Sequence, residues 1–267
     1  MTSREKFDIA RREVTERLYE RGLEFVYIAC YGSDNYGLAY EKSDMDLKVI
    51  VVPSLHAIVS NSKPISETWD FEWGQADIKD VRLMCENWMK QNTNFLEILF
   101  TDYFYINPNY LAATLTMLSH REEIARIDEG RHMRASLGMQ DQKYHALKHP
   151  FPSKIEVIER YGYDPKQLSH IVRLYDLMTK YIKGKSYKEC ITPMGEIADY
   201  IKAIKTAAYH TDIETVEELA RKYMKMTEEL YQSYKEKATT CEAGVAALDT
   251  FRYSVIRETL KKEVAEG

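Results

Sequence analysis

The fold is decided by the stretch Tyr27-Ile28-Ala29-Cys30-Tyr31-Gly32-Ser33, a polar loop, and then Asp44-Met45-Asp46-Leu47-Lys48-Val49-Ile50-Val51. Each apolar run has the length of one strand, and successive side chains of a strand point to opposite faces. We therefore expect Asp44 and Asp46 on one face of a sheet, with Met45 and Leu47 in a core. Two carboxylates on one face, with few positive partners nearby in sequence, repel each other unless a cation lies between them. Oxygen ligands of this kind suit Mg²⁺.

Length and composition indicate a globular protein without a dominant basic surface. The 267 residues allow one large domain or two modest ones, and the residues are 45% hydrophobic and 30% charged. The net charge of −5 argues against extensive nonspecific binding of nucleic acid. The start of the chain is charged, no apolar run approaches the length of a membrane span, and the four cysteines lack metal-ligand spacing. These features predict a cytoplasmic protein with no membrane segment.

The first part of the chain mixes helix and strand patterns. An amphipathic helix is predicted over residues 5–21, where Gly22 ends it. Strands are predicted over 24–31, 45–52 and 75–79, with an irregular connection over 54–74. A helix over 80–91 and a short helix or turn over 93–100 follow.

After residue 109 the strand patterns fade and helical patterns take over. Asp164-Pro165 is a typical helix start, because Asp caps free amides and Pro is favoured at the first helical position. The predicted helices cover 109–120, 131–148, 165–183, 194–209, 213–238 and 242–264. The predicted fold class is α+β, with an α/β domain over residues 1–107 and a helical domain over 108–267.

The opening stretch has the residue types that nucleotidyl transfer requires. Gly32 allows close approach of the backbone to phosphates, and the Ser33 hydroxyl and adjacent amides can donate to phosphate oxygens. Asp44 and Asp46 are the candidate metal ligands, and Asp77 on the next predicted strand is the candidate third carboxylate. Asp80 more plausibly caps the following helix. A Gly-Ser pair alone is more often a simple turn, and an Asp-x-Asp pair alone more often lies in a solvated loop. When both motifs occur together between apolar segments, they predict a nucleotidyl-transfer site.

These residues resemble the DNA polymerase β nucleotidyltransferase superfamily, whose pattern is Gly-Ser, about ten residues, Asp-x-Asp and a distant third acid. The spacing of Gly32-Ser33-x-x-x-Gly37 and Ser43-Asp44-x-Asp46 is similar to that of the RlaP-type, or YcgL-like, predicted nucleotidyltransferases associated with RNA repair. Asp77 and the segment Asn92-Thr93-Asn94-Phe95-Leu96-Glu97 resemble further parts of that family. Asp34 stands where the family pattern has His, which leaves the exact nucleotide contacts open.

A second resemblance lies in the helical part. Gly162-Tyr163-Asp164-Pro165-Lys166-Gln167-Leu168-Ser169-His170-Ile171-Val172-Arg173-Leu174 is similar to a Gly-Tyr-Asp-x-Lys-x-x-x-His-x-x-Arg-Leu segment of the same family. Lys166, His170 and Arg173 share one face of the predicted helix. The resemblance implies that they bind nucleotide or acceptor phosphates, and the alternative is a solvated helix face.

The resemblance implies a Mg²⁺-dependent enzyme, with Mn²⁺ as an alternative ion. It would transfer a nucleoside monophosphate from an NTP such as ATP to an acceptor hydroxyl and release pyrophosphate. An RNA 3′ end is the acceptor that the family implies, while the acidic net charge keeps a protein or a small molecule open. The alternative function is a nucleotide-binding or toxin–antitoxin-type regulatory module with slow turnover or none.

Overall fold

The computed structural model describes residues 2–40, 43–208 and 211–266, which belong to two compact units. The first unit contains Met1–Ile127 and Thr240–Gly267, and the second contains Asp128–Thr239. This division differs from the predicted ranges of 1–107 and 108–267. The first unit includes helices that precede the second unit in sequence and a helix that follows it, and these helices pack on one another. Local sequence patterns do not encode such long-range packing.

The first unit is built on a five-stranded mixed sheet with the strand order β3-β4-β2-β1-β5. Strands β2 and β4 are parallel, and the other neighbours are antiparallel. The strands are β1 (Phe25–Tyr31), β2 (Asp46–Val51), β3 (Ser66–Phe71), β4 (Gly74–Asp80) and β5 (Phe104–Ile106). The α+β class predicted from the sequence is confirmed.

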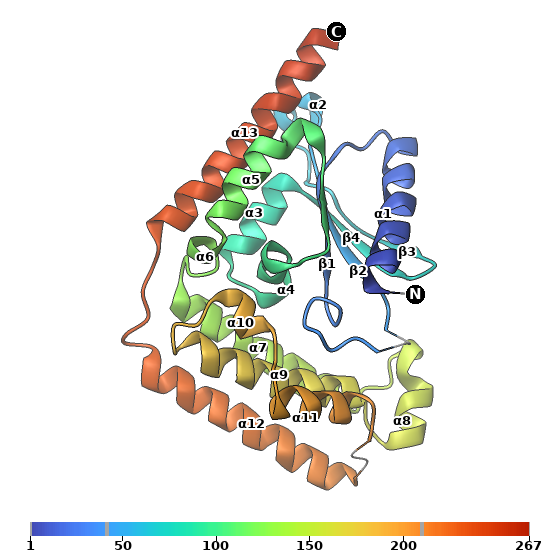
Figure 1. The fold of residues 1–267 in the computed structure, drawn as a ribbon, viewed down its shortest axis with the longest axis vertical. Coiled ribbons are helices and arrows are strands. Elements are labelled where there is room, and N and C mark those ends of the chain that lie inside the picture. Colours follow the sequence, from blue (N-terminus) through green and yellow to red (C-terminus); the bar gives the residue numbers. More distant parts are fainter. Residues whose placement is uncertain (1, 41–42, 209–210, 267) are drawn as a thin grey trace. The chain divides into compact units, whose positions relative to one another are not determined.

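Helix α1 (Ser3–Glu20) covers one face of this sheet (Figure 1). Its apolar side packs into a core with the inward-facing residues of the central strands, among them Met45, Leu47 and Ile78. Asp44 is exposed and Asp46 half-buried, while Met45 and Leu47 are fully buried. The predicted burial of Met45 and Leu47 is confirmed, while Asp44 lies before the first residue of β2.

The opposite face of the sheet is covered by helices from both ends of the chain (Figure 1). Tyr27 of β1 donates a hydrogen bond from its hydroxyl to the Ile98 carbonyl at 2.9 Å. Helix α13 packs on α3, α5 and α6, where Gly244 lets it approach the main chain of Glu123 closely. The elements on this side are α3 (Val81–Met89), α4 (Thr93–Leu96), η1 (Glu97–Phe100), η2 (Pro108–Tyr110), α5 (Leu111–Ser119), α6 (Arg121–Ile124) and α13 (Glu242–Glu266).

Two strands and one helix of the first unit fall outside the predicted elements. The short helix α2 (Leu55–Val59) and strand β3 lie in the segment predicted to be irregular. Strand β3 is an edge strand in which only Trp69 is buried, so it has no apolar run to mark it. Strand β5 has only three residues. Asp80 caps α3 by accepting from the Arg82 amide at 2.8 Å, as predicted.

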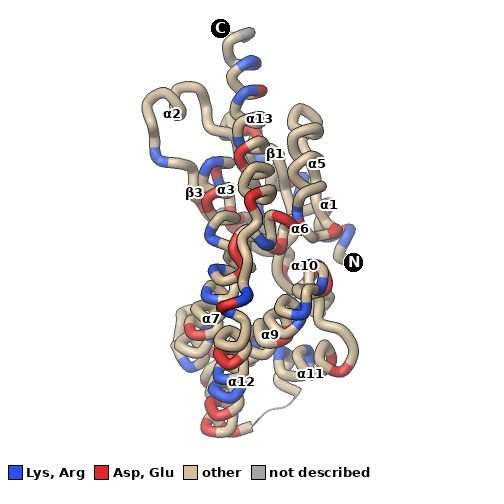
Figure 2. The backbone as a smooth tube through the Cα atoms, turned by 90° about the vertical axis from the view of Figure 1, so that its left-hand side faces the viewer, with Lys and Arg blue, Asp and Glu red and all other residues tan. Residues whose placement is uncertain are grey.

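The second unit is a helical assembly around α9 (Pro165–Tyr181). Asp164 caps α9 and Pro165 is its first residue, as predicted. Gln140 donates from Nε2 to the Ile171 carbonyl and to Thr227 Oγ1, both at 2.9 Å, and so joins three helices. Figure 2 shows charges of both signs along α12. The other helices are α7 (Glu129–Ala146), η3 (Pro152–Lys154), α8 (Ile155–Tyr161), α10 (Tyr187–Ile191), α11 (Glu196–Lys205) and α12 (Ile213–Tyr234).

Candidate active site

The fold brings the Gly-Ser pair next to the second aspartate. Tyr31, the last residue of β1, is paired with Asp46, the first residue of β2. Gly32 follows with φ of +83°, a conformation that side chains other than glycine's rarely adopt. The space where a Cβ would lie on Gly32 is 3.8 Å from Asp46 Oδ2. Two motifs that are fourteen positions apart in sequence (32 to 46) therefore form one surface.

The segment that carries Asp44 and Asp46 is held by the turn between β3 and β4. The Met45 amide donates to the Trp73 carbonyl at 2.8 Å, and the Gln75 amide donates to Asp46 Oδ1 at 3.3 Å. Gly74 is essential to this approach, because a Cβ there would lie 2.5 Å from the Met45 carbonyl oxygen. The turn thus sets the position of both carboxylates through the backbone between them.

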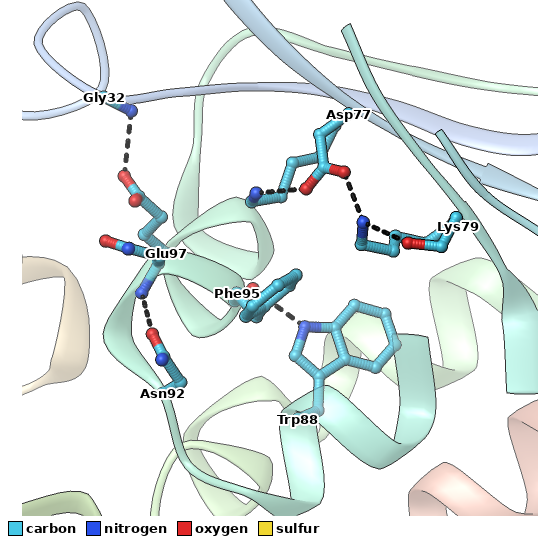
Figure 3. A network of polar contacts seen from close by, with 10 residues as sticks. Gly32, Asp77, Lys79, Trp88, Asn92, Phe95 and Glu97 are labelled. Carbon is cyan, nitrogen blue, oxygen red and sulfur yellow. Dashed lines mark hydrogen bonds and ion pairs between the residues drawn. The ribbon is translucent and has the colours of Figure 1, made fainter. Parts of the chain in front are cut away.

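Asp77 lies in β4 beside Lys48 of β2, and two ammonium groups engage its carboxylate (Figure 3). Lys48 Nζ is 2.9 Å from Oδ2, and Lys79 Nζ is 2.5 Å from Oδ1. Although burial raises the pKa of Asp77, the charges and hydrogen bonds of the two lysines outweigh it and hold this pKa below its ordinary value. Asp77 is therefore an ionised partner of two lysines.

Lys48 is the residue that our sequence reasoning missed. We expected few positive groups near Asp44 and Asp46 in sequence. Lys48 lies two positions after Asp46 on the same face, and its side chain, only 4% exposed, pairs with Asp77. Its ammonium lies 4.1 Å from the centre of the Tyr31 ring and 4.5 Å from that of Phe95. The signal was present: a lysine interrupts the apolar run of β2 at the second position after Asp46.

The Gly32 amide is not directed to an open phosphate site in this structure. It donates to Glu97 Oε2 at 3.0 Å, as Figure 3 shows. The Asn35 side-chain amide donates to the Glu97 main-chain carbonyl, also at 3.0 Å. The buried Glu97 therefore anchors the Gly32 loop from η1, and a phosphate would have to take its contacts from other groups of this loop, such as the half-buried Ser33.

Asp34, the acid that interrupts the family pattern, is bound at the start of α1. Its Oδ1 accepts from the Ser3 hydroxyl at 2.6 Å. A carboxylate in this position is favourable because the first turn of a helix has free amides and the positive end of the helix dipole. The negative charge of Asp34 thus has a local partner in the fold.

Lys166, His170 and Arg173 follow one another on α9 in the second unit but differ in exposure. Lys166 is exposed, His170 is half-buried and Arg173 is 2% exposed. Burial, together with the charges of Arg173, Lys143, Lys166 and Lys205, lowers the pKa of His170 well below its ordinary value. His170 is accordingly neutral at pH 7. The predicted cationic face is reduced to two charges, of which only Lys166 lies on the surface of its unit.

The carboxylates differ in how well they suit a metal ion. Asp46 supplies hard oxygen donors beside Gly32, and the exposed Asp44 lies two positions before it, so this pair suits a divalent cation by its chemistry. Asp77 fits poorly, because both of its oxygens already contact ammonium groups. Across residues 2–40, 43–208 and 211–266, no group of three or more His, Cys, Asp or Glu side chains is arranged to hold a metal.

Comparison with known proteins gives matches among solved structures. No protein-family model and no curated protein matches the chain. Among solved structures it is similar to the crystal structure of a nucleotidyltransferase-like protein from Exiguobacterium sibiricum 255-15, with 15% sequence identity and a TM-score of 0.27. The match covers 88% of this chain and 74% of that chain. A likeness at this level carries no functional conclusion.

No helix in the described parts of the chain has an apolar stretch long enough to cross a bilayer.

Proposed function

We propose that the chain is a nucleotidyltransferase of the DNA polymerase β type, related to the RlaP-type proteins. The observation that supports this most is the pairing of Tyr31 with Asp46, which brings Asp46 close to Gly32 and the Gly-Ser and Asp-x-Asp motifs together at adjacent strand ends. A glycine turn next to paired carboxylates is an arrangement that can hold a metal-bound triphosphate.

In this proposal Asp44 and Asp46 hold Mg²⁺, or Mn²⁺ in its place, and Ser33 with the remaining donors of the Gly32 loop binds phosphate. The metal supplies charge neutralisation at the phosphates of the NTP. Asp77 completes the acidic face and orients Lys48. Lys166 is the surface group of the second unit that we assign to phosphate binding, with Arg173 and His170 supporting it from within α9.

The acceptor that we propose is an RNA 3′ hydroxyl, on the resemblance to the RNA-repair family alone. Attack by this hydroxyl on the α-phosphorus forms the new phosphodiester bond, breaks the bond to the bridging oxygen and releases pyrophosphate, and the hydroxyl proton passes to solvent. Protein and small-molecule hydroxyls are the competing acceptors, and the site residues handle phosphate equally well for each.

One observation favours the second candidate function, a nucleotide-binding or toxin–antitoxin-type regulatory module. Both oxygens of Asp77 are engaged by lysines, so the acid best placed to assist deprotonation of an acceptor is already an ion-pair partner. Such a site could retain NTP while turning it over slowly.

Incubation with each α-labelled NTP and Mg²⁺ distinguishes the two functions. RNA with a free 3′ hydroxyl, a protein mixture and small polyols are offered separately as acceptors, and pyrophosphate release is recorded in parallel. We expect label in RNA together with pyrophosphate release, with both lost in Asp46→Asn. NTP binding in equilibrium dialysis, without labelling or pyrophosphate from any acceptor, would support the regulatory module instead.

A further inference from the structure

We propose that the Lys48 ammonium takes the place of a second divalent ion at the acidic face, which is the surface formed by Asp44, Asp46 and Asp77. This face then binds one divalent cation, through Asp44 and Asp46. The inference rests on the proposed function for its purpose. The contacts that support it are those of Lys48 and Lys79 with the two oxygens of Asp77.

Lys48 is held on several sides. Its strand pairs with β4 so that Lys48 and Asp77 are direct neighbours, and the ammonium bonds the carboxylate at 2.9 Å. The Tyr31 and Phe95 rings contact the same ammonium, and aromatic faces stabilise a cation that has lost most of its water. With 4% of the side chain exposed, Lys48 is a fixed charge of the fold.

Lys79 completes the arrangement from the other side of Asp77. Its ammonium contacts Oδ1 at 2.5 Å and the Ser66 hydroxyl at 3.0 Å, which ties it to the edge strand β3. Each oxygen of Asp77 thus faces its own ammonium. A divalent cation at Asp77 would have to approach two positive charges in a partly buried site, where repulsion is poorly screened.

The geometry of the sheet places this fixed charge next to the metal ligands. Lys48 follows Asp46 by two residues on the same face, a separation of about 7 Å along a strand. Asp77 is one strand further on, diagonal to Asp46 across the β2–β4 pair. A second divalent ion beside Asp77 would face the two ammonium groups that already contact both of its oxygens.

Counting bound Mn²⁺ tests the inference without any turnover. Electron paramagnetic resonance titration of the full-length protein, in the absence of nucleotide, is compared with the Asp44→Asn/Asp46→Asn double variant, and the difference counts the ions at this face. We expect one ion for the wild type. For Asp77→Asn we expect the same count and an affinity within about threefold, whereas loss of a true ligand or its support costs about 10–100-fold or more.

Removing the fixed charge should open a second cation site. Lys48→Met is expected to raise the count from one to two, and Lys48→Arg to leave it at one. Lys79→Met should leave the count at one, because Lys48 still bonds Asp77. If Lys48→Met does not fold, Lys48→Gln gives the second reading, with two ions expected. Two ions in the wild type with one lost in Asp77→Asn, or no ion at all, would overturn the inference. One bound ion without any NTP turnover would contradict the proposed function but would still support the inference about Lys48.

Discussion

Gly74 touches the main chain of Met45, and this contact sets the place of the two aspartates on either side of Met45. A Cβ at position 74 would lie 2.5 Å from the Met45 carbonyl oxygen and 2.9 Å from its carbonyl carbon. The neighbour is backbone, which cannot turn aside as a flexible side chain could. Position 74 therefore links the β3–β4 turn to the candidate site directly.

Gly74→Ala should displace the Asp44–Asp46 segment. Overpacking of this kind costs roughly 1–3 kcal/mol, and we expect urea unfolding to show it together with loss of nucleotidyl transfer. Gly138→Ala is the matched control, because a Cβ there meets nothing within 4 Å on an exposed turn of α7. It should stabilise by roughly 0.5–1 kcal/mol through helix propensity. Equal effects of the two variants would contradict the assigned contact.

Asp46→Asn should abolish transfer while the fold persists. The side chain keeps its shape but loses the charge that holds a divalent cation, and we expect a fall in kcat of at least about 100-fold. Pyrophosphate release under saturating NTP measures it. Asp249→Asn changes an exposed aspartate of α13 and should leave kcat unaltered. Activity retained by Asp46→Asn would place the site elsewhere in the chain.

Glu97→Ala should loosen the Gly32 loop. It removes the acceptor of the Gly32 amide from a buried position and leaves that amide without its partner, at a cost of about 1–3 kcal/mol. Faster hydrogen exchange at residues 32–37 and a lower urea midpoint are the expected readings. Glu97→Gln keeps a carbonyl acceptor, so its loop should exchange at nearly the wild-type rate. A loop that exchanges normally in Glu97→Ala would refute the anchoring role.

His170 should make stability fall in mild acid. Its pKa in the folded protein lies well below the ordinary value of 6.5, so between the two pKa values the unfolded chain binds the proton and the folded chain does not. The free energy of unfolding is therefore unaffected by His170 protonation above about pH 6.5. It decreases as pH falls below that value, by up to about 1.4 kcal/mol per pH unit. Urea unfolding of wild type and His170→Gln from pH 7.5 to 5 should show the difference. His145→Gln, at an exposed position of α7, should retain the wild-type slope.

Substitutions at Lys166 and Arg173 should have different effects, the first on NTP binding and the second on the stability of the fold. Lys166→Ala removes an exposed charge, and we expect weaker NTP binding in equilibrium dialysis with an unchanged urea midpoint. Arg173→Ala empties a buried position and should cost roughly 2–3 kcal/mol of stability. Unaltered NTP binding by Lys166→Ala would remove α9 from the nucleotide site and leave its basic residues a structural role.

Much of the first unit, and the start of α9 in the second unit, could be predicted because the signals are local. The alternation from Asp44 to Leu47, the glycine that ends α1 and the Asp164-Pro165 start of α9 all depend on backbone geometry or burial of one face. Strand β3 and the return of α13 to the first unit could not, because an exposed edge strand has no apolar run and helix docking depends on residues distant in sequence.

By itself the sequence determined which chemical groups are available: a Gly-Ser turn, two aspartates on one strand face and a third acid on a later strand. The tertiary structure decided what each group does, because partners come from elements far apart in the chain. Glu97 binds the Gly32 amide from 65 positions away, and Lys48 and Lys79 bind Asp77. Spacing along the chain cannot show that a carboxylate expected to bind metal lies between a buried and a half-buried ammonium group. That depends on the register of β2 against β4, which the packing of the whole sheet sets.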